Sequence, residues 1–102
     1  MALHLRQICL VGRDLATIRA DLETVFGMPV CHVDPAVAKF GLENILLAAG
    51  SQFLEVVSPI QEGTAAGRYL DRRGGDGGYM VITQVRDKAE QDAVRAQWAF
   101  RT

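Results

Sequence analysis

The stretch from Ser51 to Pro59 constrains the fold most, because it is the clearest strand in the sequence. Side chains alternate along a strand, so Phe53, Glu55 and Val57 share one face, and apolar residues occupy the other. A strand that is apolar on both faces is typical of the middle of a covered sheet. Glu55 is the exception, since a buried carboxylate needs a cation, a metal ion or hydrogen-bond donors. The plainer alternatives are an arginine partner or an open, solvated sheet face.

Composition limits the classes of partner. The chain has 102 residues, 49% of them hydrophobic and 23% charged, which predicts one ordinary globular domain. A net charge of -1 gives no support for a nucleic-acid partner or a basic membrane surface. The sequence lacks an apolar run of membrane-helix length and a signal-peptide pattern at its start, so we expect a cytoplasmic protein. Cys9 and Cys31 lie in apolar runs without metal-type spacing and are interpreted as reduced core residues.

Hydrophobic periodicity and turn residues predict strands alternating with three helices. Asp14, Thr64 and Asp87 are placed as helix N-caps. In the first strand, Gln7 shares a face with Leu5 and Cys9. The predicted strands span residues 3–12, 29–33, 37–47, 51–59 and 79–85, and the helices span 15–26, 65–73 and 88–98.

An internal repeat organises these elements. The segment Arg13-Asp14-Leu15-Ala16 joins a strand to a helix, and Arg86-Asp87-Lys88-Ala89 does so again later in the chain. The first copy continues into three further strands, whereas the second stops after its helix. We therefore predict a first module at 1–62, a linker helix and glycine-rich turn at 63–77, and a partial second module at 78–102.

Several of these segments together resemble the vicinal oxygen chelate superfamily, which includes glyoxalase I, extradiol dioxygenases, epimerases and bleomycin-resistance proteins. The segments are the two strand-Arg-Asp junctions, Gly27-Met28-Pro29, Phe40-Gly41-Leu42-Glu43-Asn44 and Phe53-Leu54-Glu55-Val56-Val57. The resemblance is closest to the glyoxalase-like branch and covers nearly the whole chain. It implies an α+β fold: a βαβββ module followed by a truncated second module of one strand and one helix, with a curved mixed sheet and helices on its convex face.

The resemblance also implies a metal site. The family holds a divalent ion through a residue of the first strand and a Glu of the fourth strand of each module. Glu55 matches the fourth-strand Glu and Gln7 the first-strand ligand. The same position of the second copy falls on Met80, a poor partner for the metals of this family, and the fourth ligand has no counterpart in this sequence. Gln7 as a hydrogen-bond partner of Glu55 is the favoured alternative. A second chain could complete the metal site with its own Gln7 and Glu55. Its first strand would then have to lie beside the first strand of this chain, a place that the strand 79–85 of the same chain could already occupy.

These observations favour a glyoxalase-like domain that binds a small organic metabolite on a concave sheet face without robust metal catalysis. The expected site contains Glu55 as the catalytic candidate and Gln7 and Glu55 as an incomplete metal pair. The substrate-binding candidates are Asn44, Phe53, Val57 and Met80.

Two alternatives stay open. One is a lyase, isomerase or dioxygenase of the same superfamily, assembled across a homodimer and dependent on Zn, Ni, Co, Mn or Fe. The other is a truncated, non-catalytic assembly module. The unfinished second module predicts a homodimer, with the segment 79–101 a candidate for exchange between chains. An anionic or dicarbonyl-type metabolite is the expected ligand, although the charges of Arg68, Arg72 and Arg73 are more simply explained as solvated.

Overall fold

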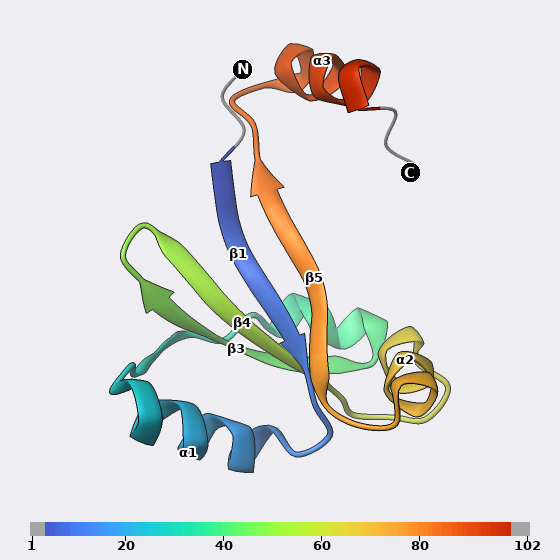
Figure 1. The fold of residues 1–102 in the computed structure, drawn as a ribbon. Coiled ribbons are helices and arrows are strands. Elements are labelled where there is room, and N and C mark those ends of the chain that lie inside the picture. The colour runs from blue at the N-terminus through green and yellow to red at the C-terminus, as the bar shows by residue number, and fades with distance from the viewer. Residues whose placement is uncertain (1–3, 99–102) are drawn as a thin grey trace.

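A curved five-stranded sheet with helices on both sides forms the protein, in a computed structural model that describes residues 4–98 (Figure 1). The strand order is β2-β3-β4-β1-β5, and β1 and β4 are the parallel pair in this otherwise antiparallel sheet. This confirms the predicted α+β class, with a βαβββ unit followed by one more strand and helix. The elements are β1 (His4–Val11), α1 (Leu15–Phe26), β2 (Val30–His32), the 3-10 helix η1 (Pro35–Phe40), β3 (Leu42–Ala49), β4 (Gln52–Pro59), α2 (Ala65–Arg73), β5 (Gly77–Gln84) and α3 (Lys88–Trp98).

The helix α1 covers one face of β3 and β4, which we call the α1 face. Asp14 caps the helix by accepting a hydrogen bond from the Thr17 amide, and Gly27 ends it in the left-handed conformation, as the sequence predicts. Apolar side chains of α1 pack against a buried cluster on the two strands. That cluster consists of Ile45, Leu47 and Val56, and the helix contributes Leu15, Ile18 and Leu22.

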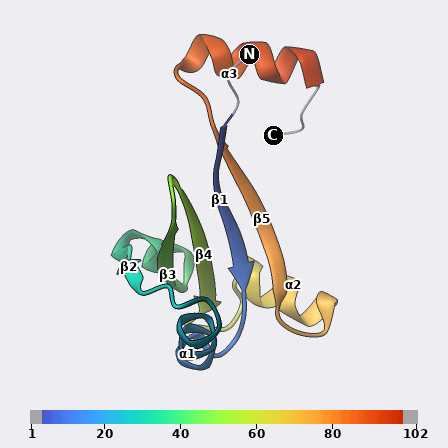
Figure 2. The same cartoon turned by 60° about the vertical axis from the view of Figure 1, so that its left-hand side comes forward.

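The helix α2 packs on the opposite face, which we call the Glu55 face (Figure 2). Its Ala66 and Leu70 contact the buried side chains of Cys9, Val11 and Val57 at the carboxyl ends of β1 and β4. We expected the helices to lie together on the convex face. α1 and α2 instead pack on opposite faces of the sheet. The apolar side of this short helix finds buried partners on the other side of the sheet, so α2 closes one end of the Glu55 face.

The predicted strand 37–47 is divided in the structure into η1 and β3. The carboxylate of Asp34 accepts a hydrogen bond from the Ala36 amide, and Pro35 at the first position favours a helical turn over a strand. Gly41 then ends η1 with a positive φ of 72° before β3 begins. β3, which follows η1, pairs with β4 in antiparallel fashion from Leu42 to Ala49.

A bulge changes the alternation of β1. The pairing with β5 shifts between Leu5 and Gln7, so Leu5 joins Ile8 on the α1 side instead of sharing the face of Gln7. Leu5 and Ile8 line an apolar cavity of about 230 Å³ with Phe26 and Leu54. The sequence alternation alone placed Leu5 on the wrong face, because an extra residue in a strand leaves no mark on the hydrophobic pattern.

The second module is limited to β5 and α3 among the described residues. β5 pairs with β1 of the same chain, and α3 lies beyond the ends of both strands in both views (Figures 1 and 2). The predicted boundaries 1–62, 63–77 and 78–102 and the exchange segment 79–101 stay predictions, and their ends at 1–3 and 99–102 lie outside the described residues. Both cysteines are free thiols, but only Cys9 is buried; Cys31, expected in the core, is exposed. Across residues 4–98, the helices are too short or too polar to cross a bilayer.

Candidate functional site

Glu55 lies near the middle of the sheet, on the strand between β3 and β1. The strand register places Cys9 of β1 and Leu46 of β3 directly beside it. Side chains paired across neighbouring strands point to the same side, so the three form the centre of the Glu55 face. The Glu55 side chain retains only 8% of its exposure. A carboxylate buried to this degree needs donors for its oxygen atoms.

Two amide side chains supply those donors. Nε2 of Gln7 donates to Oε1 of Glu55 at 2.5 Å, and Nδ2 of Asn44 donates to Oε2 at 2.8 Å. Gln7 comes from β1 and Asn44 from β3, so the carboxylate links three strands. We call these three residues the amide clamp. The favoured sequence interpretation, Gln7 as a hydrogen-bond partner of Glu55, is the geometry that the structure has.

The orientation of Asn44 is fixed by a further contact. Its Oδ1 accepts a hydrogen bond from the backbone amide of Asp34 at 2.9 Å, just before η1. A backbone N–H can only donate, so the oxygen of the Asn44 amide must face Asp34 and its nitrogen must face Glu55. Asn44 is 2% exposed and cannot exchange these partners for water. It therefore presents a donor, and not an oxygen ligand, to the carboxylate.

Cys9 completes the polar centre as a neutral group. Burial, the charge of Glu55 and a hydrogen bond to that carboxylate together raise the pKa of its thiol to about 12, and burial contributes most. The thiol is fully buried. It therefore keeps its proton at neutral pH and does not act as a nucleophile.

Apolar side chains border the clamp where the Glu55 face is open. Phe53 and Met80, both expected to bind substrate, lie on this face because they pair with Gln7 and Cys9 in the register. Leu46 and Ile82 share the face, and the sequence reading missed them because their strand register was not known. Val57 also points to this side, but it is 3% exposed and packs beneath α2. The structure thus gathers Gln7, Asn44, Phe53, Glu55 and Met80 and separates Val57 from the open surface.

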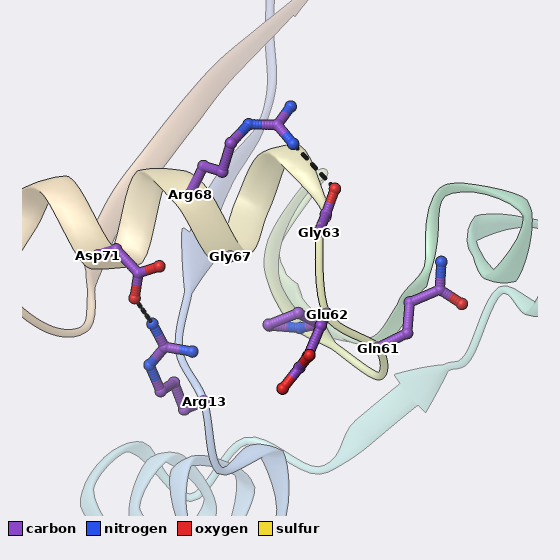
Figure 3. A pocket seen from close by; sticks show the side chains of 8 residues that line it. Arg13, Gln61, Glu62, Gly63, Gly67, Arg68 and Asp71 are labelled. Atoms are coloured by element: carbon purple, nitrogen blue, oxygen red, sulfur yellow. Dashed lines mark hydrogen bonds and ion pairs between the residues drawn. The ribbon is translucent and has the colours of Figure 1, made fainter.

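A cavity of about 650 Å³ lies elsewhere, at the N-terminal end of α2 (Figure 3). Its charges are balanced: Arg13 forms an ion pair with Asp71, and Nη1 of Arg68 donates to the Gly63 carbonyl at 2.8 Å while Glu62 also lines the space. Because both signs of charge are present in equal number, this cavity has no strong electrostatic preference for an anion or a cation.

Comparisons with known proteins bear on the fold. No protein-family model and no curated protein sequence matches this chain. A methylmalonyl-CoA epimerase from Mycobacterium tuberculosis matches the structure with a TM-score of 0.81 at 20% identity, over 96% of this chain and 65% of the epimerase chain. A hypothetical protein from Bacillus halodurans matches with a TM-score of 0.84 at 14% identity, over 96% and 70% of the two chains. A variant methylmalonyl-CoA epimerase from Streptomyces coelicolor, solved with 2-nitronate-propionyl-CoA, matches with a TM-score of 0.83 at 20% identity, over 98% and 73%.

The chain has the vicinal oxygen chelate fold. It spans less than two thirds of the Mycobacterium tuberculosis epimerase and about seven tenths of the other two proteins. The likeness is one of architecture, since the identities lie between 14% and 20%.

The metal ion implied by this fold family does not fit the side chains present. Within residues 4–98, no group of three or more His, Cys, Asp or Glu side chains is arranged to hold an ion. Gln7 and Glu55 are two oxygen-bearing candidates, but both carboxylate oxygens already accept amide N–H groups. The position expected for a further ligand, Met80, pairs with Cys9, and Ile82 pairs with Gln7. Two oxygen ligands do not hold a divalent ion tightly.

The locked amide makes Asn44 the critical member of the clamp. Asn44→Ala leaves a carboxylate oxygen and the Asp34 N–H buried without partners, so we expect a loss of about 2 kcal/mol in the free energy of unfolding. Urea denaturation measures the change. Glu43→Ala is the matched control, because Glu43 is the exposed neighbour on the same strand and its removal should change stability by less than about 0.5 kcal/mol. Equal effects of the two substitutions would contradict the clamp.

Alkaline pH should destabilise the protein through Cys9. The folded thiol keeps its proton to about pH 12, whereas in the unfolded chain it titrates near 9.0, so both states are protonated below pH 9 and only the unfolded state loses the proton above it. The free energy of unfolding should then fall by up to about 1.4 kcal/mol per pH unit above pH 9. Urea titrations of the parent and of Cys9→Ala between pH 8 and about pH 11 isolate this slope. Cys31→Ala, which removes the exposed thiol, should follow the parent, and a Cys9→Ala profile that matches the parent would contradict the assignment.

Proposed function

We propose that this chain is a binding module of the vicinal oxygen chelate fold that holds a small organic molecule on the Glu55 face without a resident metal ion. The observation that carries the proposal is the fixed direction of the Asn44 amide, which gives Glu55 a hydrogen-bond donor where a metal site would need an oxygen. The charge of the carboxylate is stabilised by neutral amide donors rather than by a cation.

The clamp and its border indicate the chemistry of the ligand. Each oxygen of a carboxylate accepts more than one hydrogen bond, so Glu55 can still accept from a hydroxyl, an enol or an amine of a bound molecule. Phe53 and Met80 offer apolar surface beside it, and 47% of Met80 is exposed. Small-molecule sites commonly combine an apolar lining with a few fixed polar groups. The expected ligand is a compact molecule with one donor group and an apolar body.

A second candidate function is that of a metal-dependent isomerase. It is favoured by the likeness to methylmalonyl-CoA epimerases. One of them, solved with methylmalonyl-CoA and NH4+, matches this chain with a TM-score of 0.84. A divalent ion would supply Lewis-acid stabilisation of a negative charge on the substrate. Further oxygen ligands would have to come from outside the described residues. A partner strand cannot bring them alongside β1, because β4 and β5 of the same chain already occupy both edges.

Glu55→Gln separates the two functions while preserving the fold. The substituted amide can accept from Asn44 through its oxygen and donate to Gln7 once the Gln7 amide turns over, so the hydrogen bonds survive and the charge is lost. We expect metal analysis of the purified protein to give well below one ion per chain. We expect a compact hydroxy acid with an apolar body, 2-hydroxyisovalerate, to shift the NMR signals of the Gln7 and Asn44 side-chain amides in chelator-treated protein.

In Glu55→Gln the ligand affinity should fall about tenfold, the worth of one hydrogen bond to a charged group. The side-chain amide of the exposed Gln91 is an internal control that should not move. Stoichiometric binding of Mn, Co, Ni or Zn that disappears in Glu55→Gln would instead establish the metal-dependent function. Absence of any ligand-induced shift at the clamp would overturn the binding module.

The proposal includes a homodimer, because the β1–β5 part of the α1 face is uncovered. Ile8 and Val81 pair across these strands and retain 43% and 69% of their exposure, since α1 packs over β3 and β4 instead. β5 is also the edge of the sheet, with unpaired backbone groups along one side. A contiguous apolar surface beside a free edge is typical of an association site, and a second copy would cover both.

Light scattering coupled to gel filtration tests the homodimer. We expect the parent to elute at twice its mass of 11.1 kDa and Val81→Lys to elute as a monomer, because a charge in the centre of the contact is not solvated there. Val25→Lys is the control, since Val25 is 73% exposed on α1, away from this surface. A parent monomer at all concentrations would rule the homodimer out.

A further inference from the structure

A second hollow lies at the hairpin end of the sheet, where Leu5 and Gln52 also border the α1-side cavity. It encloses about 320 Å³ between the start of β1, the turn that joins β3 to β4, and the end of β5. Six polar or charged residues line it, and they are the basis of the inference. They are His4, Arg6, Ser51, Gln52, Gln84 and Arg86.

The charge of this hollow is one-sided. Arg6 and Arg86 contribute two guanidinium groups, and the described lining contains no carboxylate. Glu90 lies outside the lining and accepts from Nε of Arg86 at 2.8 Å, which uses one of the five N–H donors of that guanidinium. The cavity beside α2 differs, because Glu62 and Asp71 line it together with its two arginines. Of these two cavities, the hollow at the hairpin end is the one suited to an anion.

The arginine on β1 is held in place for such a role. Nη1 of Arg6 donates to Oε1 of Gln84 at 3.0 Å, which fixes one edge of the guanidinium and leaves its other donors for a ligand. Gln84 lies two residues from Ile82, which faces Gln7 across the strand pair, so Arg6 and Gln84 reach the side of the sheet that carries Glu55. The bulge between Leu5 and Gln7 is what brings the Arg6 side chain to this side.

The hollow and the clamp are close enough to hold one molecule. Arg6 directly precedes Gln7 on β1, and its partner Gln84 lies two residues from Ile82, roughly 7 Å at about 3.3 Å per residue. Phe53 pairs with Gln7 and therefore lies on the Glu55 face beside these residues. A ligand of moderate length can therefore place an anionic end at the arginines, an apolar segment over Phe53 and a donor group at Glu55.

We propose that the hollow binds the oxyanion group, a phosphate or a carboxylate, of the molecule held on the Glu55 face. Guanidinium forks bind both groups through paired N–H donors, and the hydroxyl of Ser51 and the amide of Gln52 add neutral donors. The inference that one molecule occupies both the hollow and the Glu55 face rests on the proposed binding function. The inference that the hollow binds an anion depends only on its two arginines.

Titration of the whole protein with inorganic phosphate, pyrophosphate and malonate at low salt tests the anion site. NMR should show saturable binding in the millimolar range or tighter, with shifts at the Arg6 and Arg86 side-chain N–H signals. Arg6→Gln and Arg86→Gln should each weaken binding about tenfold, as expected for the loss of a charge-assisted hydrogen bond. Arg72→Gln makes the same change in net charge on the exposed surface of α2 and should leave binding unchanged. The strongest of the three anions identifies the group.

The variants separate this inference from the proposed function. Glu55→Gln should leave the binding of the free anions intact while it weakens the organic ligand, so failure of the Glu55 face does not remove the anion site. Absence of saturable anion binding, or equal losses in Arg6→Gln and Arg72→Gln, would overturn the inference. If an anionic ligand is bound at Glu55 with an affinity that Arg6→Gln does not change, the hollow is not part of its site and the link is wrong.

Discussion

The buried carboxylate of Glu55 is the constraint on which this structure depends. An ionised group at 8% exposure is costly unless donors surround it, and hydrogen bonds to a charged group contribute about 1.5–3 kcal/mol each. The donors come from Gln7 on β1 and Asn44 on β3, one on either side of β4. A shift of either strand by one residue would turn the amide to the opposite face and leave the charge unpaired. The clamp therefore specifies the register of the three central strands as well as the chemistry of the face.

The division of the helices between the two faces determines which surfaces stay open. α1 covers β3 and β4 on one side, and α2 covers the carboxyl ends of β1 and β4 on the other. Neither helix covers the outer part of the β1–β5 pair, which extends toward α3 (Figure 1). The radius of gyration of 15.1 Å exceeds the roughly 13 Å expected for a compact domain of this length. This extended half exposes the apolar surface that is proposed to contact a second copy and the arginines that are proposed to bind an anion.

The sequence predicted the elements whose signals are local. The helices α1 and α2 have polar N-caps and a final glycine, and their limits follow from those residues. The need of Glu55 for hydrogen-bond donors followed from its apolar neighbours, and its pairing with Gln7 from the family resemblance. Two features depend on contacts that the hydrophobic pattern of the sequence does not reveal. The Asp34 carboxylate and Gly41 convert the first part of a predicted strand into η1, and a bulge before Gln7 moves Leu5 to the other face. The partner of Asn44 was hidden for the same reason, because a backbone amide of a loop gives no sequence signal.

The orientation of one amide bears on the two proposed functions. An amide group presents either its oxygen, which binds a cation, or its nitrogen, which donates to an anion. Gln7 has no second partner among the described contacts and can turn from one state to the other, so it is compatible with both functions. Asn44 cannot turn, since the Asp34 N–H holds its oxygen on the opposite side from Glu55. Asn44 therefore supplies a hydrogen-bond donor to Oε2 of Glu55 and no oxygen ligand for a cation there. The loop before η1 thus acts on the site through a single hydrogen bond, which keeps a donor and not an oxygen ligand of Asn44 beside Glu55.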